Sequence, residues 1–310
     1  MKKLRLLLIA ALALVLAVSV GMLVRQNIQY REGEEAYAEA EALVELPDLS
    51  QLPRPEPVPE EAPSEEEIAP EEQPVYVDPY ADALRNMDFS ALREVNSDVL
   101  GWILIPGTAV SYPVVQGTDN DYYLNHTWKK WTSVVGSIFL ECQNSRDLSD
   151  FNTIIYGHRM NNGSMSASLK NYKKQSWWSD PPCVYITDDS GSHKYEIFAA
   201  YEVSTEGETY RLGFGSDREK QAFIDYCLAQ SVIDTGVVPR TYDRILTLST
   251  CTGQGHATRW VVQAVLRGEA PQEAEAPLEE LPPEEEEKKA PSALDIALGR
   301  ATGKAEEPAS

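Results

Sequence analysis

Two long segments rich in Glu and Pro limit where this chain can fold. Residues 32–74 are dominated by Glu, Pro and Ala, and residues 269–310 repeat that composition. Such segments have too little apolar surface to offset their conformational entropy, and their prolines and like charges favour extended chain. We therefore predict an acidic stalk over 25–74, a disordered tail over 269–310 and one folded domain over 75–268, which is long enough for a single sizeable core.

Charge and motif content exclude several classes of function. The net charge of −22 is concentrated in the two acidic segments, so it argues against nucleic acid as a partner without describing a site. The sequence has no Gly-rich phosphate loop, no His-Glu-x-x-His array and no Cys-x-x-Cys pair. We expect no cofactor and no metal ion. The four cysteines could form disulfides in three pairings, and their spacing does not choose between them.

The N-terminus carries an apolar run, Leu6–Val24, preceded by a basic cluster in residues 1–5. A helix of this length measures about 28 Å, close to the hydrocarbon core of a bilayer. A cleaved secretory signal ending near Ala17–Ser19 is the alternative, but the apolar region of such signals is usually shorter. We predict a single transmembrane anchor over 6–24, with a cytoplasmic end at residues 1–5 and the rest of the chain outside the cell membrane.

Apolar periodicity within residues 75–268 predicts a mainly β domain with added helices. Short alternating or apolar runs bounded by turn residues are typical of strands. The predicted strands are 102–105, 112–115, 136–140, 152–156, 184–187, 194–203, 245–250 and 260–266. One or two short helices are predicted between 78 and 95, a short helix over 170–178 and a longer one over 216–230.

The last two strands place a thiol next to a cation. Ile245–Thr250 and Trp260–Leu266 flank a short polar loop that contains two glycines. Cys251 ends the first strand and Arg259 opens the second. If the strands pair, both side chains lie at one edge of a sheet, where they can face the same bound carbonyl.

A histidine for proton transfer is best supplied by a rigid element. His158 directly follows a buried strand and satisfies this requirement. His256 is the main competitor because it is five residues from Cys251, but it lies in the Gly-rich loop. His126 and His193 lie in turn-like segments with no partner suggested, and we expect ordinary surface positions for them.

Three separated motifs resemble those of one family. Leu248–Cys251, followed by Arg259-Trp-Val-Val, resembles the active-site strand pair of the sortases, the cysteine transpeptidases that anchor proteins to Gram-positive cell walls. Tyr156–Met160 resembles the sortase histidine motif. Asn96–His126, continued by Gly136–Leu140, resembles the opening of the class B sortase domain, and a helix ahead of the cysteine strand is also a class B feature.

The resemblance implies a fold and a reaction. The implied fold is a closed eight-stranded β-barrel with N-terminal helices and a helix inserted before the cysteine strand. The implied enzyme cleaves a Pro-x-Thr-type sorting signal after Thr, forms a thioester on Cys251 and transfers the surface protein to a cell-wall or pilin amine. In this mechanism His158 moves the proton and Arg259 donates hydrogen bonds to the oxyanion.

The resemblance and the strand pattern together suggest five substrate-binding positions. They are Asn120, Leu124, Tyr156, Tyr210 and Ser249. Asn120 and Leu124 match groove-lining positions of the family, although a simple turn role would also explain Asn120. Ser249 shares a strand face with Cys251 because side chains alternate, but it could be an ordinary barrel position. Tyr210 belongs to a loop that we expect to form a groove wall.

Three further alternatives remain open at this point. Asp78-Pro79-Tyr80 resembles the lid sequence of some pilus-building sortases, whereas a helix cap explains the same residues more simply. A secreted cysteine peptidase could use the same catalytic residues, with water in place of the amine. A non-catalytic, stalked wall-binding scaffold could retain the fold without the chemistry.

Overall fold

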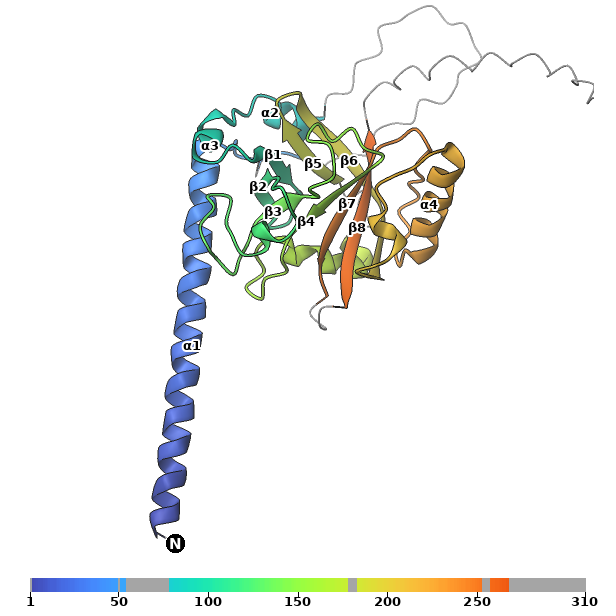
Figure 1. Ribbon diagram of the computed structural model, residues 1–310. Coiled ribbons are helices and arrows are strands. Elements are labelled where there is room, and N and C mark those ends of the chain that lie inside the picture. Colours follow the sequence, from blue (N-terminus) through green and yellow to red (C-terminus); the bar gives the residue numbers. More distant parts are fainter. Residues whose placement is uncertain (1, 50, 54–77, 178–182, 253–256, 268–310) are drawn as a thin grey trace, which may run out of the picture. The chain divides into compact units, whose positions relative to one another are not determined.

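The computed structural model describes residues 2–49, 51–53, 78–177, 183–252 and 257–267 (Figure 1). Its strands close into an eight-stranded barrel in the order β1-β2-β3-β4-β7-β8-β6-β5, which confirms the predicted fold class. The strands are β1 Val99–Leu104, β2 Ser111–Val115, β3 Ile138–Leu140, β4 Asn152–Tyr156, β5 Cys183–Asp188, β6 Gly191–Ser204, β7 Ile245–Cys251 and β8 Thr258–Arg267.

The described helices lie before the barrel and in its connections. The α-helices are α1 Lys2–Leu43, α2 Pro79–Leu84, α3 Ser90–Val95 and α4 Asp217–Gln230. The 3-10 helices are η1 Tyr122–Leu124, η2 Ser166–Lys173, η3 Gln175–Trp177 and η4 Glu208–Tyr210. The predicted helix ahead of the cysteine strand is therefore confirmed as α4.

The start of α2 decides between the two interpretations of Asp78. Its carboxylate accepts hydrogen bonds from the backbone N–H groups of Tyr80 and Ala81, each at 3.0 Å. The same carboxylate lies 2.8 Å from Lys194 Nζ and accepts the Tyr185 hydroxyl. The helix-cap interpretation is confirmed, because Asp78 accepts from the first backbone N–H groups of α2, while its contacts with Tyr185 and Lys194 tie the helix start to β5 and β6.

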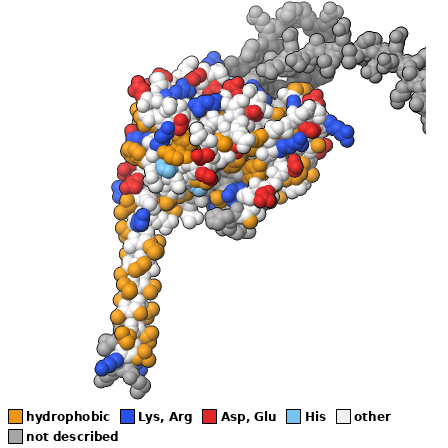
Figure 2. All heavy atoms as spheres, viewed as in Figure 1, with side chains coloured by type: hydrophobic (Ala, Val, Ile, Leu, Met, Phe, Trp, Pro, Cys, Tyr) orange, Lys and Arg blue, Asp and Glu red, His pale blue; other side chains and the backbone are white. Residues whose placement is uncertain are grey.

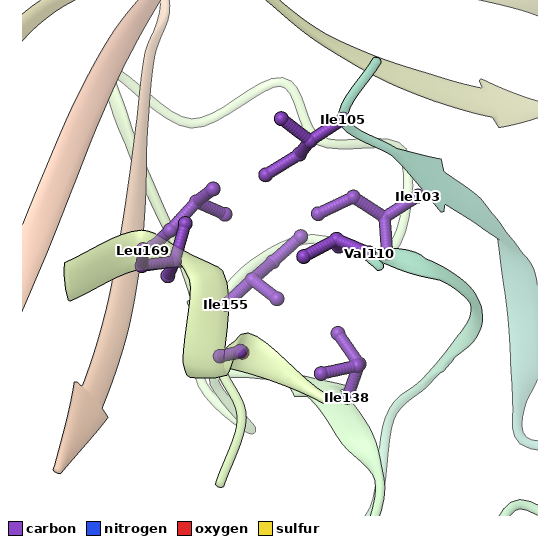
Figure 3. Close-up of a pocket in the computed structure, with 8 residues that line it drawn as sticks. Ile103, Ile105, Val110, Ile138, Ile155 and Leu169 are labelled. Atoms are coloured by element: carbon purple, nitrogen blue, oxygen red, sulfur yellow. The ribbon is translucent and has the colours of Figure 1, made fainter. Parts of the chain in front are cut away.

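The interior of the barrel is a packed apolar core. Figure 3 shows branched side chains from strands, from the β1–β2 turn and from η2 pointing toward one another. They are Ile103, Ile105, Val110, Ile138, Ile155 and Leu169. The cavity they leave is about 10 Å³, which is about the space of one water molecule. A peptide cannot enter the barrel, so a substrate must bind on its outside.

The two faces of β7 are buried for different reasons. Leu246 and Leu248 belong to the interior core, whereas Ile245 packs on the outside of the barrel in a cluster with Phe223 and Ile224 of α4. Side chains alternate along a strand. The odd-numbered residues of β7, including its last one, therefore lie on the outer face.

The N-terminal helix is longer than the sequence predicted. We expected extended chain from Glu32 onward, and this is wrong for Glu32–Leu43, which continues α1. Ala and Glu favour helix, and no proline interrupts the segment. Tyr37, Ala40 and Val44 recur at helical spacing and are buried in the main core cluster. Residues 54–74 of the predicted stalk and the tail over 269–310 lie outside the described residues.

The first part of α1 is apolar and exposed. Figure 2 shows hydrophobic side chains around this part of the helix. By length and composition, α1 is the one helix among the described residues that could cross a membrane. The predicted anchor over residues 6–24 stays a prediction.

Candidate active site

The parallel pairing of β4 and β7 brings a histidine next to a cysteine. Tyr156 pairs with Ser249, and the next amide, Gly157 N–H, donates to the Ser249 carbonyl at 3.1 Å. In a parallel pair, both chains advance in the same direction. Two residues further on, they reach His158 and Cys251, so these two side chains lie at the same end of neighbouring strands.

The antiparallel pairing of β7 and β8 adds an arginine. Cys251 is the direct partner of Arg259, and directly opposed residues project from the same face of a sheet. The structure therefore brings together three predicted residues, His158, Cys251 and Arg259, from three adjacent strands. The three residues lie on the outer face of the barrel. A substrate can reach this face, whereas the interior of the barrel is filled by side chains.

Cys251 and His158 shift each other's pKa in the directions that a nucleophile and its acid require. Hydrogen bonding with His158 lowers the pKa of the Cys251 thiol, against the opposing effect of burial, and the nearby Arg259 cation lowers it further. The interaction with Cys251 raises the pKa of His158 above its ordinary value. The thiolate and imidazolium forms stabilise one another, and they titrate as a coupled pair.

The four cysteines differ in their capacity to react. All of them lie in the described part of the chain and are free. Burial raises the pKa of Cys183 to about 12 and of Cys227 to about 11, and burial followed by the adjacent Glu141 also raises that of Cys142. Cys251 alone among them has a lowered pKa. Since the thiolate is the nucleophile, this contrast favours Cys251.

The imidazole of His158 is held by a backbone carbonyl. Its Nε2 donates to the carbonyl oxygen of Leu124 at 2.6 Å. This hydrogen bond also favours the cationic ring and raises the pKa of His158. Leu124, predicted as a groove residue, therefore contributes its backbone to the site, while its side chain is 41% exposed.

Two arginines lie close to the thiol, and the sequence indicated only one of them. Arg259 Nη1 donates to the Thr258 carbonyl at 3.0 Å. Arg159 donates to the carbonyl of Thr252, one residue beyond Cys251, and its charge also lowers the pKa of the thiol. Arg159 directly follows the candidate histidine, which is the signal that could have marked it.

A buried carboxylate joins two of the predicted substrate-binding residues. Glu141 Oε2 accepts from Asn120 Nδ2 at 2.7 Å and from the Tyr156 hydroxyl at 2.9 Å. The side-chain oxygen of Asn120 accepts the Cys142 N–H at 2.9 Å. Asn120 is therefore more than a turn residue, because it ties its loop to the end of β3. No local sequence pattern indicates Glu141, because its partners are distant along the chain.

The remaining predicted groove residues form one continuous wall. The rings of Tyr156 and Tyr210 stack with centroids 6.4 Å apart. The Tyr210 hydroxyl is 2.9 Å from Ser249 Oγ. Ser249 is 2% exposed, so in this structure it supports Tyr210 and is not open to a ligand. Roles in substrate binding stay predictions for all five positions.

A buried polar network holds this wall against the strands. Asn152 donates to the carbonyls of Thr209 and Arg211 at 3.0 and 2.9 Å, which fixes the segment that carries η4. The Thr247 hydroxyl donates to Asn152 Oδ1 at 2.7 Å, and Gln263 Nε2 donates to that hydroxyl at 3.0 Å. Buried polar groups need such partners, so the network specifies one position for the wall.

The expectations about His256 and about metal ions are not tested by the structure. The competing histidine, His256, lies outside the described residues. Across the described ranges, no group of three or more His, Cys, Asp or Glu side chains is placed to hold a metal ion. Independence from metal and cofactor stays a prediction, which retained activity in a chelator would support.

Comparison with known proteins identifies the family. The sortase domain family matches residues 103–267. The chain belongs to the sortase family. It is 36% identical over 163 residues to Sortase B of Staphylococcus aureus, an alignment that covers 53% of this chain and 67% of that protein.

Two solved structures place this sortase near class B. A structure described as a Staphylococcus aureus sortase B-substrate complex shares 34% identity with a TM-score of 0.55, covering 59% of this chain and 85% of that one. Sortase B from B. anthracis in complex with AAEK1 shares 30% identity with a TM-score of 0.60, covering 78% and 99%. The predicted resemblance to class B sortases and the enzyme class of sortase-type cysteine transpeptidase are confirmed.

Proposed function

We propose that this sortase is a membrane-anchored enzyme of the class B type that joins surface proteins to an amine. The substrate is a protein with a C-terminal Pro-x-Thr-type sorting signal, and the acceptor is an amine of the cell wall or of a pilin. The observation that carries the proposal is the meeting of His158, Cys251 and Arg259 at the ends of β4, β7 and β8. The catalytic domain is extracellular, and α1 crosses the membrane once, with its N-terminus in the cytoplasm.

In the first half-reaction the Cys251 thiolate attacks the carbonyl carbon of the Thr in the signal. The carbonyl oxygen becomes an oxyanion, to which the Arg259 guanidinium donates hydrogen bonds. When the tetrahedral intermediate collapses, the C–N bond breaks and the imidazolium of His158 gives its proton to the departing amine. The product of this step is a thioester on Cys251, with His158 neutral.

In the second half-reaction the acceptor amine attacks the thioester carbonyl. Neutral His158 takes a proton from the attacking nitrogen, and Cys251 departs as a thiolate. The new C–N bond is an amide, and the thiolate and imidazolium pair is restored. His158 gives up one proton in the first half-reaction and gains one in the second. The interaction between the thiolate and the imidazolium favours the charged pair at the start and at the end of this cycle.

A two-substrate assay tests this function. We expect the full-length protein in detergent to cleave a Pro-x-Thr peptide and, with an added amine such as triglycine, to yield the amide product. A thioester on Cys251 should be detected by mass spectrometry before the amine is added. If hydrolysis is the sole outcome at saturating amine, the secreted cysteine peptidase becomes the better interpretation.

Arg259→Lys is expected to lower kcat for peptide cleavage by about 10²- to 10³-fold with little change in KM. Lysine keeps the charge but lacks the planar fork of donors, so it stabilises the oxyanion less well. The matched control is Arg267→Lys at the other end of β8, where Arg267 pairs with Glu196 at 3.0 Å. Equal rates for the two variants would remove Arg259 from the mechanism.

A further inference from the structure

We propose that Tyr37 of α1 is a positioning residue for His158. It acts through the β2–β3 loop, residues 116–137, which carries the carbonyl that holds the imidazole. The N-terminal helix would thereby help to set the geometry and the proton affinity of the catalytic histidine.

The contact of α1 with the loop is buried and specific. Tyr37 is 6% exposed, and its hydroxyl donates to the Gly136 carbonyl at 2.5 Å. The indole N–H of Trp128, in the same loop, donates to the Ala36 carbonyl of α1 at 2.7 Å. Burial raises the pKa of Tyr37 far above its ordinary value. Its hydroxyl therefore remains a donor wherever the enzyme works.

The loop segment that receives Tyr37 is bonded to the segment that holds the imidazole. Ser137 N–H donates to the Tyr123 carbonyl at 2.9 Å, and its hydroxyl donates to the His126 carbonyl at 2.8 Å. Leu124 lies between these two acceptors, and its own carbonyl accepts from His158 at 2.6 Å. A shift of Gly136–Ser137 would therefore move that carbonyl.

Gly136 also lies beside the imidazole ring, with no room for a side chain between them. Its φ of +61° is in the left-handed region. A β-carbon there would lie 2.8 Å from His158 Cδ2 and 2.7 Å from the Leu124 carbonyl oxygen. The backbone of Gly136 thus lines the imidazole site, and Tyr37 donates a hydrogen bond to the carbonyl of that same residue. Displacing the Gly136 backbone would weaken the hydrogen bond between His158 and the Leu124 carbonyl, which favours the cationic ring.

Two variants of the full-length protein test the role. In Tyr37→Phe we expect the rate of Cys251 alkylation by iodoacetamide at pH 7, followed by peptide mapping, to fall about 3- to 10-fold. The pKa of His158, measured by NMR titration of its ring, should fall because a hydrogen bond to the cationic ring is weakened. Gly136→Ala should shift both readouts in the same direction by displacing the ring.

The matched control removes a buried hydroxyl far from the site. Tyr185 on β5 is fully buried and donates to Asp78, so Tyr185→Phe should lower the melting temperature while leaving alkylation and the His158 pKa unchanged. The proposal is overturned if Tyr37→Phe behaves like this control.

These readouts separate the present inference from the proposed function on which it builds. Alkylation and the NMR titration report the thiolate and the imidazole without a peptide substrate. A protein that fails to join peptide to amine, yet shows the Tyr37 effect, would refute the proposed function alone. With an active enzyme, we also expect kcat in Tyr37→Phe to fall while KM for the peptide is unchanged.

Discussion

Cys251→Ala is expected to eliminate thioester formation and to lower turnover of a sorting peptide by about 10⁴- to 10⁶-fold. The side chain supplies the only atom that bonds to the substrate in the proposed reaction, so nothing in the site can replace it. We expect the variant still to bind peptide, because the contacts within the predicted groove wall of Tyr156, Tyr210 and Ser249 do not involve the thiol. Rapid-quench kinetics and mass spectrometry of the protein measure the loss.

Cys227→Ala is the matched control for this experiment. Cys227 lies on the buried face of α4, and burial raises the pKa of its thiol to about 11. The control should lose stability by about 1 kcal/mol or more without losing the thioester. In cells, surface-protein attachment that survives Cys251→Ala would favour the non-catalytic scaffold.

His158→Gln is expected to lower kcat/KM by about 10²- to 10⁴-fold near neutral pH. The glutamine amide can still donate to the Leu124 carbonyl, but it cannot transfer a proton. Without the imidazolium, the main influence that lowers the pKa of Cys251 is gone. The thiolate then forms only at higher pH, so the pH midpoint of Cys251 alkylation should rise relative to the parent protein.

The sign of that shift distinguishes catalysis from packing. A residue that merely supports the fold would change the melting temperature and leave the alkylation midpoint in place. His193→Gln serves as the control, because His193 lies on β6, where its ring contacts Ser190 and Asp188. An unchanged midpoint in His158→Gln would assign the low thiol pKa to the arginines instead.

Pairing between strands that are close in sequence made much of the site predictable. Cys251 and Arg259 are separated by one short loop, so a hairpin-like register places them opposite each other. His158 was predicted from its position just after a strand, and the parallel register of β4 with β7 brings it to the thiol. The closed barrel was predicted from the family resemblance, because side-chain periodicity indicates strands but not how they close into a barrel.

Contacts between distant segments could not be predicted in this way. Glu141 is a single acidic residue after a strand, and its link to Asn120 and Tyr156 depends on how the barrel closes. The packing of Tyr37 on Gly136 joins residues 99 positions apart. For Glu32–Leu43, composition predicted extended chain, and this prediction is wrong. The segment contains no proline, and its apolar residues recur on one helical face, so its glutamates form part of a helix.

The strand pattern, the reactive residue types and the elements that carry them follow from side-chain periodicity and local turns, so they can be predicted without a structure. Three features depend on the tertiary structure. They are the outward direction of the Cys251 thiol from β7, the hydrogen bond of His158 to the Leu124 carbonyl, and the contact of the Tyr37 hydroxyl with the loop that carries this carbonyl. Those features depend on the closure of the barrel and on the docking of α1. Both bring together groups whose separation along the chain leaves no local signal.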